Sequence, residues 1–197
     1  ILQCGLWEDL QRRPALPTAA LVTDIGNDIL YGASAGQIAE WLEQCLARLR
    51  GVCDRIVVTE LPLARIASVT AWQYRVIRWL LFPGSRVTFA DAMQRAREVN
   101  ARVIELAAQY RAVLRTPRLV WYGLDPIHIR RAAWSSAWGE ILSDAGERVA
   151  PHSARGSWRR WSQLRRQRPQ ARRLFGIPQR CEQPACILRS GSAISLY

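Results

Sequence analysis

The sequence has 197 residues, of which 49% are hydrophobic and 22% are charged, and its formal net charge at pH 7 is +12. This length suits one domain with one buried core and excludes a large multidomain assembly. The composition excludes disorder over the whole length, and no apolar run approaches the roughly 18 residues of a membrane-spanning helix.

The positive charge is concentrated near the carboxyl terminus, and every basic residue is Arg. Residues 1–150 carry 18 Arg against 15 acidic residues, whereas residues 151–197 carry 10 Arg against Glu182 alone. We therefore expect a core over residues 1–150 and an Arg-rich extension over residues 151–197. Arg mixed with aromatic residues can bind phosphate groups, so contact of residues 155–180 with nucleic acid or an anionic membrane is one interpretation. A solvated, partly disordered extension is the interpretation that we favour.

The cysteines and the first residues bear on cellular context. The five cysteines form an odd set without a Cys-x-x-Cys pair, which argues against a zinc ribbon or a disulfide framework and favours a reducing compartment such as the cytoplasm. The sequence begins at Ile1 rather than Met, and its opening segment lacks the features of a signal peptide. We expect that the beginning of the protein is missing.

The first half of the sequence alternates short apolar runs with a helical pattern. Residues 19–23 predict a buried strand that ends in the polar loop 24–28. Ser34 and Gln37 have the spacing of a capping box, and apolar residues then recur at helical spacing until Gly51. Residues 55–59 predict a second strand, closed by a proline at position 62.

The next elements are longer helices and a third strand. Residues 66–82 predict a helical excursion, and residues 89–110 predict a long packing helix. The aromatic residues of the excursion (Trp72, Trp79 and Phe82) are expected to pack in the core for the most part, or to form a wall for an acyl or alcohol group. Residues 119–122 predict the third strand, the loop 123–128 follows, and a last helix is expected around residues 134–142.

This alternation of strands and helices predicts a doubly wound α/β fold with a parallel sheet. In such sheets, functional groups lie on the loops at the carboxyl ends of the strands. The loops 24–28 and 123–128 have that position, and both are rich in polar residues.

Asp125, three residues before His128, has a spacing at which the carboxylate can bind one ring nitrogen and leave the other as a general base. Asn27, in the other loop, carries a side-chain amide that can donate to a developing oxyanion. The simpler alternative is a turn Asp that caps a helix, an exposed His and a turn Asn.

Residues 21–28 and 125–128 resemble the third and last sequence blocks of the SGNH, or GDSL-type, serine hydrolases. The resemblance implies a flavodoxin-like three-layer α/β/α fold, an oxyanion donor at Asn27 and the acid and base of a catalytic triad at Asp125 and His128. It further implies a small-molecule or lipid-like ester as substrate, with no metal or organic cofactor. We expect Gly26, Asp28 and Tyr122 to lie beside this substrate.

The sequence departs from the family pattern at two places. Position 25 is Ile where the family usually has Gly, and no serine precedes Asn27, although the family's nucleophile lies in an upstream Gly-Asp-Ser segment. We therefore expect an ester hydrolase whose nucleophile is absent from this sequence and whose oligomeric state is open. The alternatives are an inactive α/β domain that binds nucleic acid or anionic surfaces through its Arg-rich tail, and a metal-dependent phosphoesterase that uses Asp24, Asp28, Asp125 and His128.

Overall fold

The computed structural model describes residues 2–146, 157–188 and 191–197. The chain divides into two compact units, one of residues Leu16–Ala154 and the other of Ile1–Ala15 together with Arg155–Tyr197. The second unit thus combines the first 15 residues with most of the predicted extension, whereas the sequence analysis assigned those first residues to the core.

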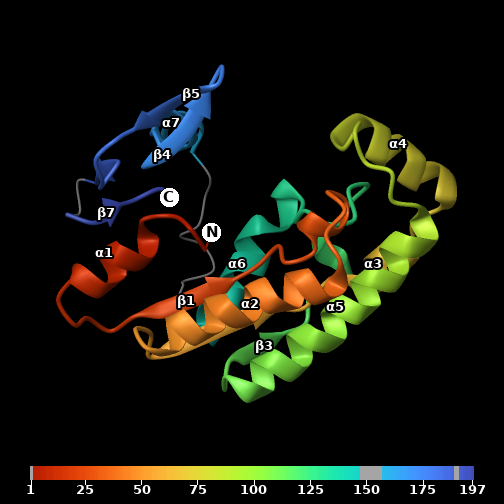
Figure 1. Ribbon diagram of the computed structural model, residues 1–197, viewed down its shortest axis with the longest axis horizontal. Coiled ribbons are helices and arrows are strands. Elements are labelled where there is room, and N and C mark those ends of the chain that lie inside the picture. The colour runs from red at the N-terminus through yellow and green to blue at the C-terminus, as the bar shows by residue number, and fades with distance from the viewer. Residues whose placement is uncertain (1, 147–156, 189–190) are drawn as a thin grey trace. The chain divides into compact units, whose positions relative to one another are not determined.

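The unit Leu16–Ala154 contains a three-stranded parallel sheet in the order β1-β2-β3 (Figure 1). Its strands are β1 (Ala19–Val22), β2 (Arg55–Thr59) and β3 (Val113–Arg115). Ala20 pairs with Ile56, and Val58 pairs with Leu114, so β2 is central and β1 and β3 are edge strands. The predicted α/β class with a parallel sheet is confirmed.

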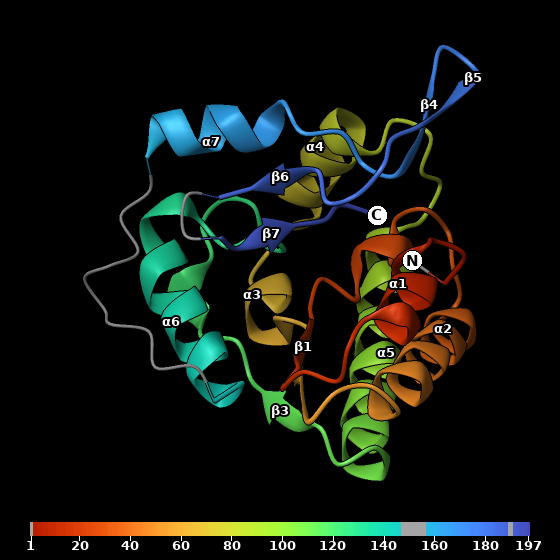
Figure 2. The same cartoon turned by 90° about the vertical axis from the view of Figure 1, so that its left-hand side faces the viewer.

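Helices cover both faces of this sheet (Figure 2). The helices of the unit are α2 (Ala35–Arg50), α3 (Leu63–Ala67), α4 (Ala71–Leu81), α5 (Phe89–Gln109) and α6 (Trp134–Asp144), with short 3-10 helices η1 (Asn27–Ile29), η2 (Leu119–Trp121) and η3 (Arg131–Ala133). Helices α2 and α5 pack side by side on one face, and α6 lies on the other. Val57 is fully buried against Trp121 and the α6 residues Ala137 and Ile141. Because successive strand residues point to opposite faces, the equally buried Val58 faces the layer of α2 and α5.

Most predicted elements are found where the sequence places them. The strands at 19–23 and 55–59 and the helix at 89–110 are confirmed, with ends that differ by no more than one residue. The helix after Ser34 begins with the predicted capping box, in which the Ser34 side chain accepts from the Gln37 backbone and the Gln37 side chain accepts from the Ser34 backbone.

One prediction about local structure is wrong, and another is confirmed in part. The third strand is not at residues 119–122, which form η2, but at Val113–Arg115. Pro117 stands between the two segments and lacks the backbone N–H that a strand ladder needs, so the chain leaves the sheet there. The helical excursion over 66–82 is confirmed at α4, but that helix begins at Ala71 because the Thr70 side chain caps it there, and the shorter helix α3 precedes it.

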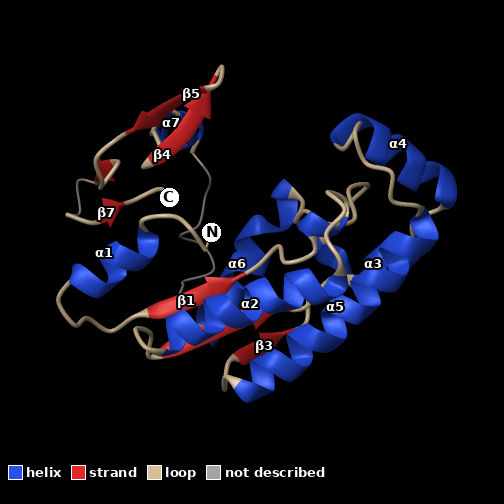
Figure 3. Ribbon diagram, in the orientation of Figure 1, coloured by secondary structure: helices blue, strands red, loops and turns tan. Residues whose placement is uncertain are grey.

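The second unit is built from short elements (Figure 3). They are α1 (Leu6–Arg12), α7 (Trp158–Arg165), the antiparallel pair β4 (Ala171–Leu174) and β5 (Ile177–Arg180), and the antiparallel pair β6 (Cys186–Ile187) and β7 (Ala193–Ile194). The Gly5 N–H donates to Gln170 Oε1 at 3.1 Å, and the Tyr197 hydroxyl donates to Asp9. The described part of the expected disordered extension therefore has regular structure.

Across the residues that the structure describes, no helix combines the length and the apolar character needed to cross a lipid bilayer.

Candidate active site

The Asp-x-x-His segment lies in a loop that the chain closes on itself. Tyr122 and Ile129 form an isolated antiparallel bridge, and the Arg130 N–H donates to the Trp121 carbonyl at 2.8 Å. From α3, the Arg65 guanidinium reaches across and donates to the Gly123 carbonyl through Nε at 2.9 Å. The loop between residues 122 and 129 is therefore fixed at its base and along one side.

Within this loop, Asp125 and His128 form the expected pair. His128 Nδ1 lies 2.7 Å from Asp125 Oδ2, while Asp125 Oδ1 accepts from the backbone N–H groups of Ile127 at 3.0 Å and His128 at 3.2 Å. The backbone bonds hold the carboxylate in place, and the carboxylate in turn holds the imidazole. Because Nδ1 is engaged, Nε2 is the nitrogen left to exchange a proton with a substrate or nucleophile. About half of the His128 side chain is exposed to solvent.

The loop after β1 carries Asn27 as the first residue of η1. Its N–H donates to the Asp24 carbonyl at 3.3 Å, and Asp24 has a positive φ of 58°, which turns the chain sharply at the end of β1. Among the described residues, no hydrogen bond occupies the half-buried Asn27 side chain. Its amide is therefore available to a ligand.

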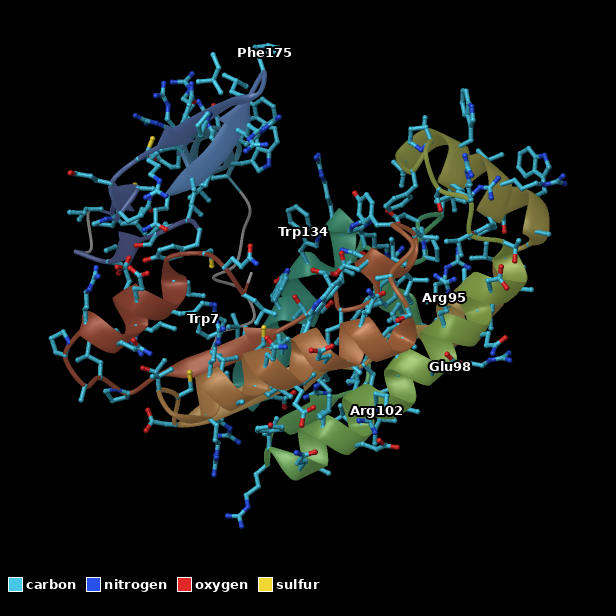
Figure 4. The ribbon with its side chains drawn as sticks, viewed as in Figure 1. Trp7, Arg95, Glu98, Arg102, Trp134 and Phe175 are labelled. Carbon is cyan, nitrogen blue, oxygen red and sulfur yellow. The ribbon has the colours of Figure 1, made fainter. Side chains whose placement is uncertain are left out.

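Gly26 occupies a position where a larger residue does not fit. A Cβ atom built at this glycine lies 2.9 Å from Leu61 Cδ2, closer than side-chain atoms normally approach. The loop after β1 thus packs directly on the residues that follow β2. From α5, Arg95 Nη1 donates to the carbonyls of Gly32 and Ala33, each at 3.1 Å, and supports the next turn of the same segment (Figure 4).

An apolar cavity of about 110 Å³ lies between these loops. It is lined by the ends of β1 and β2, by the inner faces of α4, α5 and α6, and by both sides of the loop 122–129. The lining includes Asn27, Gly26, Tyr122, Ile127, Ile129, Glu60, Leu61, Tyr74, Ile77, Phe89, Ala96, Trp121 and Trp138. A cavity of this size accepts a short alkyl chain or a small ring.

Some of the predicted site residues line the cavity, and others do not. Asn27, Gly26 and Tyr122 line it, whereas Asp125 and His128 do not, although their neighbours Ile127 and Ile129 do. Asp28 is exposed and lies outside the lining. Trp72 and Trp79 neither pack in the core, as we expected, nor form the alternative aromatic wall, since both side chains are exposed and α4 instead turns Tyr74 and Ile77 inward.

Electrostatics shows that the two loops face each other. Burial and, to a smaller extent, the negative charge of Asp24 together raise the pKa of Tyr122 to about 12. Tyr122 begins one loop and Asp24 begins the other, so the polar ends of β1 and of η2 converge at this edge of the sheet.

Sequence reasoning missed a polar group at the end of β2. Glu60 lines the cavity, and its carboxylate accepts from Asn100 Nδ2 at 3.0 Å and from the Thr116 hydroxyl. Asn100 Oδ1 accepts from the Leu61 N–H at 2.8 Å, so one buried amide fixes both residues that follow β2. The available signal was Asn100 itself, a polar residue beside Val99 and Val103 on the apolar stripe of α5.

The structure assembles neither a metal site nor a serine nucleophile among the residues that it describes. No group of three or more described His, Cys, Asp or Glu side chains is placed to hold a metal ion, so Asp24, Asp28, Asp125 and His128 do not form the site of the metal-dependent phosphoesterase alternative. None of the residues that line the cavity is a serine.

Comparison with known proteins adds no assignment, since no protein-family model, curated protein or solved structure matches this chain.

Proposed function

We propose that this chain supplies the acid, the base and one oxyanion donor of a serine ester hydrolase of the SGNH type. The observation that carries the proposal is the 2.7 Å contact between His128 Nδ1 and Asp125 Oδ2, in a loop that lines an apolar cavity. The unpaired amide of Asn27 on the same cavity supports it.

In the proposed reaction, a serine hydroxyl attacks the carbonyl carbon of an ester. His128 Nε2 takes the hydroxyl proton, and Asp125 orients the imidazolium through Nδ1. The Asn27 amide donates to the oxyanion of the tetrahedral intermediate. The imidazolium then protonates the departing alcohol, and a water molecule, deprotonated by the same imidazole, releases the acid and restores the serine.

The nucleophile in this proposal comes from outside the present sequence. The order β1-β2-β3, with three parallel strands consecutive in the chain, is compatible with one side of a flavodoxin-like sheet of order 2-1-3-4-5. Strand β1 has an unpaired edge in the described structure, and its residues Leu21 and Val22 are only partly buried. We propose that a further parallel strand, ending in the serine, pairs with that edge.

We propose that the cavity binds the acyl side of the ester. Its lining is mainly aliphatic and aromatic, and the hydroxyl of Tyr122 and the amide of Asn27 are among the few polar groups in it. Such a site binds a short acyl chain by removing apolar area from water and orients the carbonyl by a few hydrogen bonds.

The test uses the longest reading frame that contains this sequence. We expect that protein to hydrolyse short-chain p-nitrophenyl esters and to form a covalent adduct with a fluorophosphonate at one serine, located by mass spectrometry. His128→Ala is expected to lower kcat at least about a thousandfold, and Asp125→Ala somewhat less. Hydrolysis that survives His128→Ala, or a frame that gives no adduct, would refute the proposal.

A second candidate function is supported by the unit of α1, α7 and β4–β7. Phe175 is 95% exposed at the turn between β4 and β5, next to Arg172 and Arg173 on β4 (Figure 4). An exposed ring with neighbouring guanidinium groups can stack on a base and bind phosphates. The test is retention of the chain on single-stranded DNA, which this candidate predicts is weakened by Phe175→Ser and by added salt.

A further inference from the structure

Helix α4 has an apolar inner face and an apolar outer face. The inner face is anchored, since the Tyr74 hydroxyl donates to the Val87 carbonyl at 2.8 Å and the Tyr74 ring lies 5.3 Å from that of Phe89. The outer face carries Trp72, Val76, Trp79 and Leu80, whose spacing places them on one side of the helix. These side chains are 66%, 40%, 74% and 66% exposed.

The exposure of the outer face follows from the way α4 is held. The Arg78 guanidinium donates to the same Val87 carbonyl at 3.0 Å, and the Phe82 ring meets the Tyr31 ring edge-on at 5.2 Å. Both contacts fix the rotation of α4 about its axis, with Tyr74 toward α5. Two tryptophans and a leucine therefore point away from the unit's core as a consequence of specific contacts. A concentration of large apolar side chains of this kind marks an interaction surface.

The charges around α4 indicate what the surface binds. Residues 61–90 contain four Arg (Arg65, Arg75, Arg78 and Arg86) and no acidic residue, and Arg75 is exposed beside the apolar stripe of α4. An anionic surface is complementary to this segment. A second copy of the chain that docked through the same segment would bring these Arg residues toward one another.

We propose that the outer face of α4 binds an anionic lipid surface. The helix lies parallel to that surface, with Trp72 and Trp79 at the level of the headgroups and acyl-chain ends and with Arg75 on lipid phosphates. Amphipathic helices with tryptophan on the apolar side and Arg at its border bind membranes in this manner.

This binding places the cavity next to the lipid. Tyr74 and Ile77 line the cavity from the inner face of the same helix, so one helix diameter, about 10 Å, separates the cavity wall from the bound surface. The substrate class is then the ester of a lipid taken from that surface. This last step rests on the proposed hydrolase function, whereas binding of α4 to the surface does not.

The experiment measures binding of the whole chain to sucrose-loaded vesicles by sedimentation. Vesicles of equimolar phosphatidylglycerol and phosphatidylcholine are compared with vesicles of phosphatidylcholine alone. We expect binding to the anionic vesicles that Trp72→Ser/Trp79→Ser weakens at least about tenfold, because two large apolar groups leave the interface. Brominated lipids should quench the tryptophan fluorescence of the unaltered chain, and Trp72→Phe/Trp79→Phe should remove most of that quenching.

The matched control is Leu119→Ser/Val120→Ser, which removes two exposed apolar residues of η2. It should leave vesicle binding within about twofold of the unaltered chain, since these residues lie outside α4. The proposal is overturned if the unaltered chain does not bind anionic vesicles, if only the control variant loses binding, or if Trp72 and Trp79 instead mediate dimerisation in lipid-free sedimentation equilibrium. Vesicle binding by this chain, together with no ester hydrolysis by the longest reading frame that contains it, would refute the hydrolase function and leave the binding surface standing.

Discussion

Helices α2 and α4 start in the same way and have opposite surroundings. Ser34 with Gln37 and Thr70 with Gln73 form complete capping boxes, and each helix then shows apolar residues at helical spacing. Yet α2 buries seven residues, whereas α4 buries only Tyr74. An apolar stripe therefore predicts a helix with an apolar face, but it does not predict what covers that face.

The difference arises from the partners of the two helices. Helix α2 packs along α5, and its buried residues run from Ala35 to Leu49, so its stripe is covered over the whole length of the helix. Helix α4 contacts the first part of α5 through Tyr74 and Phe89. The remaining apolar surface of α4 is accounted for by the lipid-binding proposal rather than by the protein core.

The largest expected difference between the two helices appears when one leucine on each is truncated to alanine. Leu46 of α2 is fully buried, so Leu46→Ala should lower the free energy of unfolding by about 2–5 kcal/mol through lost burial and a new cavity. Leu80→Ala on the outer face of α4 should change it by less than about 0.5 kcal/mol. Urea unfolding followed by far-ultraviolet circular dichroism measures both. Equal losses would show that the outer face of α4 is packed against protein.

The sequence predicts contacts between residues that are close together in the chain, and it does not predict contacts between residues that are far apart. The Asp125–His128 pair and both helix caps depend on residues three positions apart, and local spacing predicts them. The link between Glu60 and Asn100 joins residues 40 positions apart, and only the packing of α5 against β2 reveals it.

The third strand shows a different limit of sequence reasoning. The segment Leu119-Val120-Trp121 has the composition of a strand, yet only Trp121 is buried and the sheet uses the three residues of β3 instead. The composition of this segment indicates only that Trp121 is buried. The 3-10 helix η2, packed on α6, buries Trp121 as well as a strand would.

Removal of the two helix caps should separate global from local stability. Ser34→Ala and Thr70→Ala each delete the hydroxyl that accepts the third backbone N–H, at a cost of about 1 kcal/mol to the helix concerned. Because α2 is part of the core, the first loss should appear in global unfolding. Because α4 is attached by one face, the second should appear mainly as faster amide exchange within α4. Identical exchange profiles for the two variants would contradict this distinction.

A smaller effect is expected when both exposed tryptophans of α4 are replaced. Trp72→Gln/Trp79→Gln should leave the unfolding midpoint within the range of ordinary surface changes, about 0.5 kcal/mol. The same double change on a core helix would be severely destabilising. A loss above about 2 kcal/mol would place these rings in a packed interface and remove the basis for lipid binding.

The smallest expected effect is the change in the pKa of Tyr122 when Asp24, in the loop after β1, loses its charge. Burial and the charge of Asp24 favour the neutral phenol, so the pKa of Tyr122 is raised from 10.0 to about 12. The stability that this shift contributes is fully present below pH 10 and is lost as the pH rises toward 12, since the folded state then binds more protons than the unfolded state.

Asp24→Asn should lower the pKa of Tyr122 by a fraction of a unit, because burial is the larger cause and remains. Tyrosinate absorbance, taken as the difference from Tyr122→Phe, measures the change, and Asp28→Asn is the control. If Asp24→Asn and Asp28→Asn have the same effect, the loop after β1 does not hold Asp24 toward Tyr122, and the convergence of the two loops on one cavity is wrong.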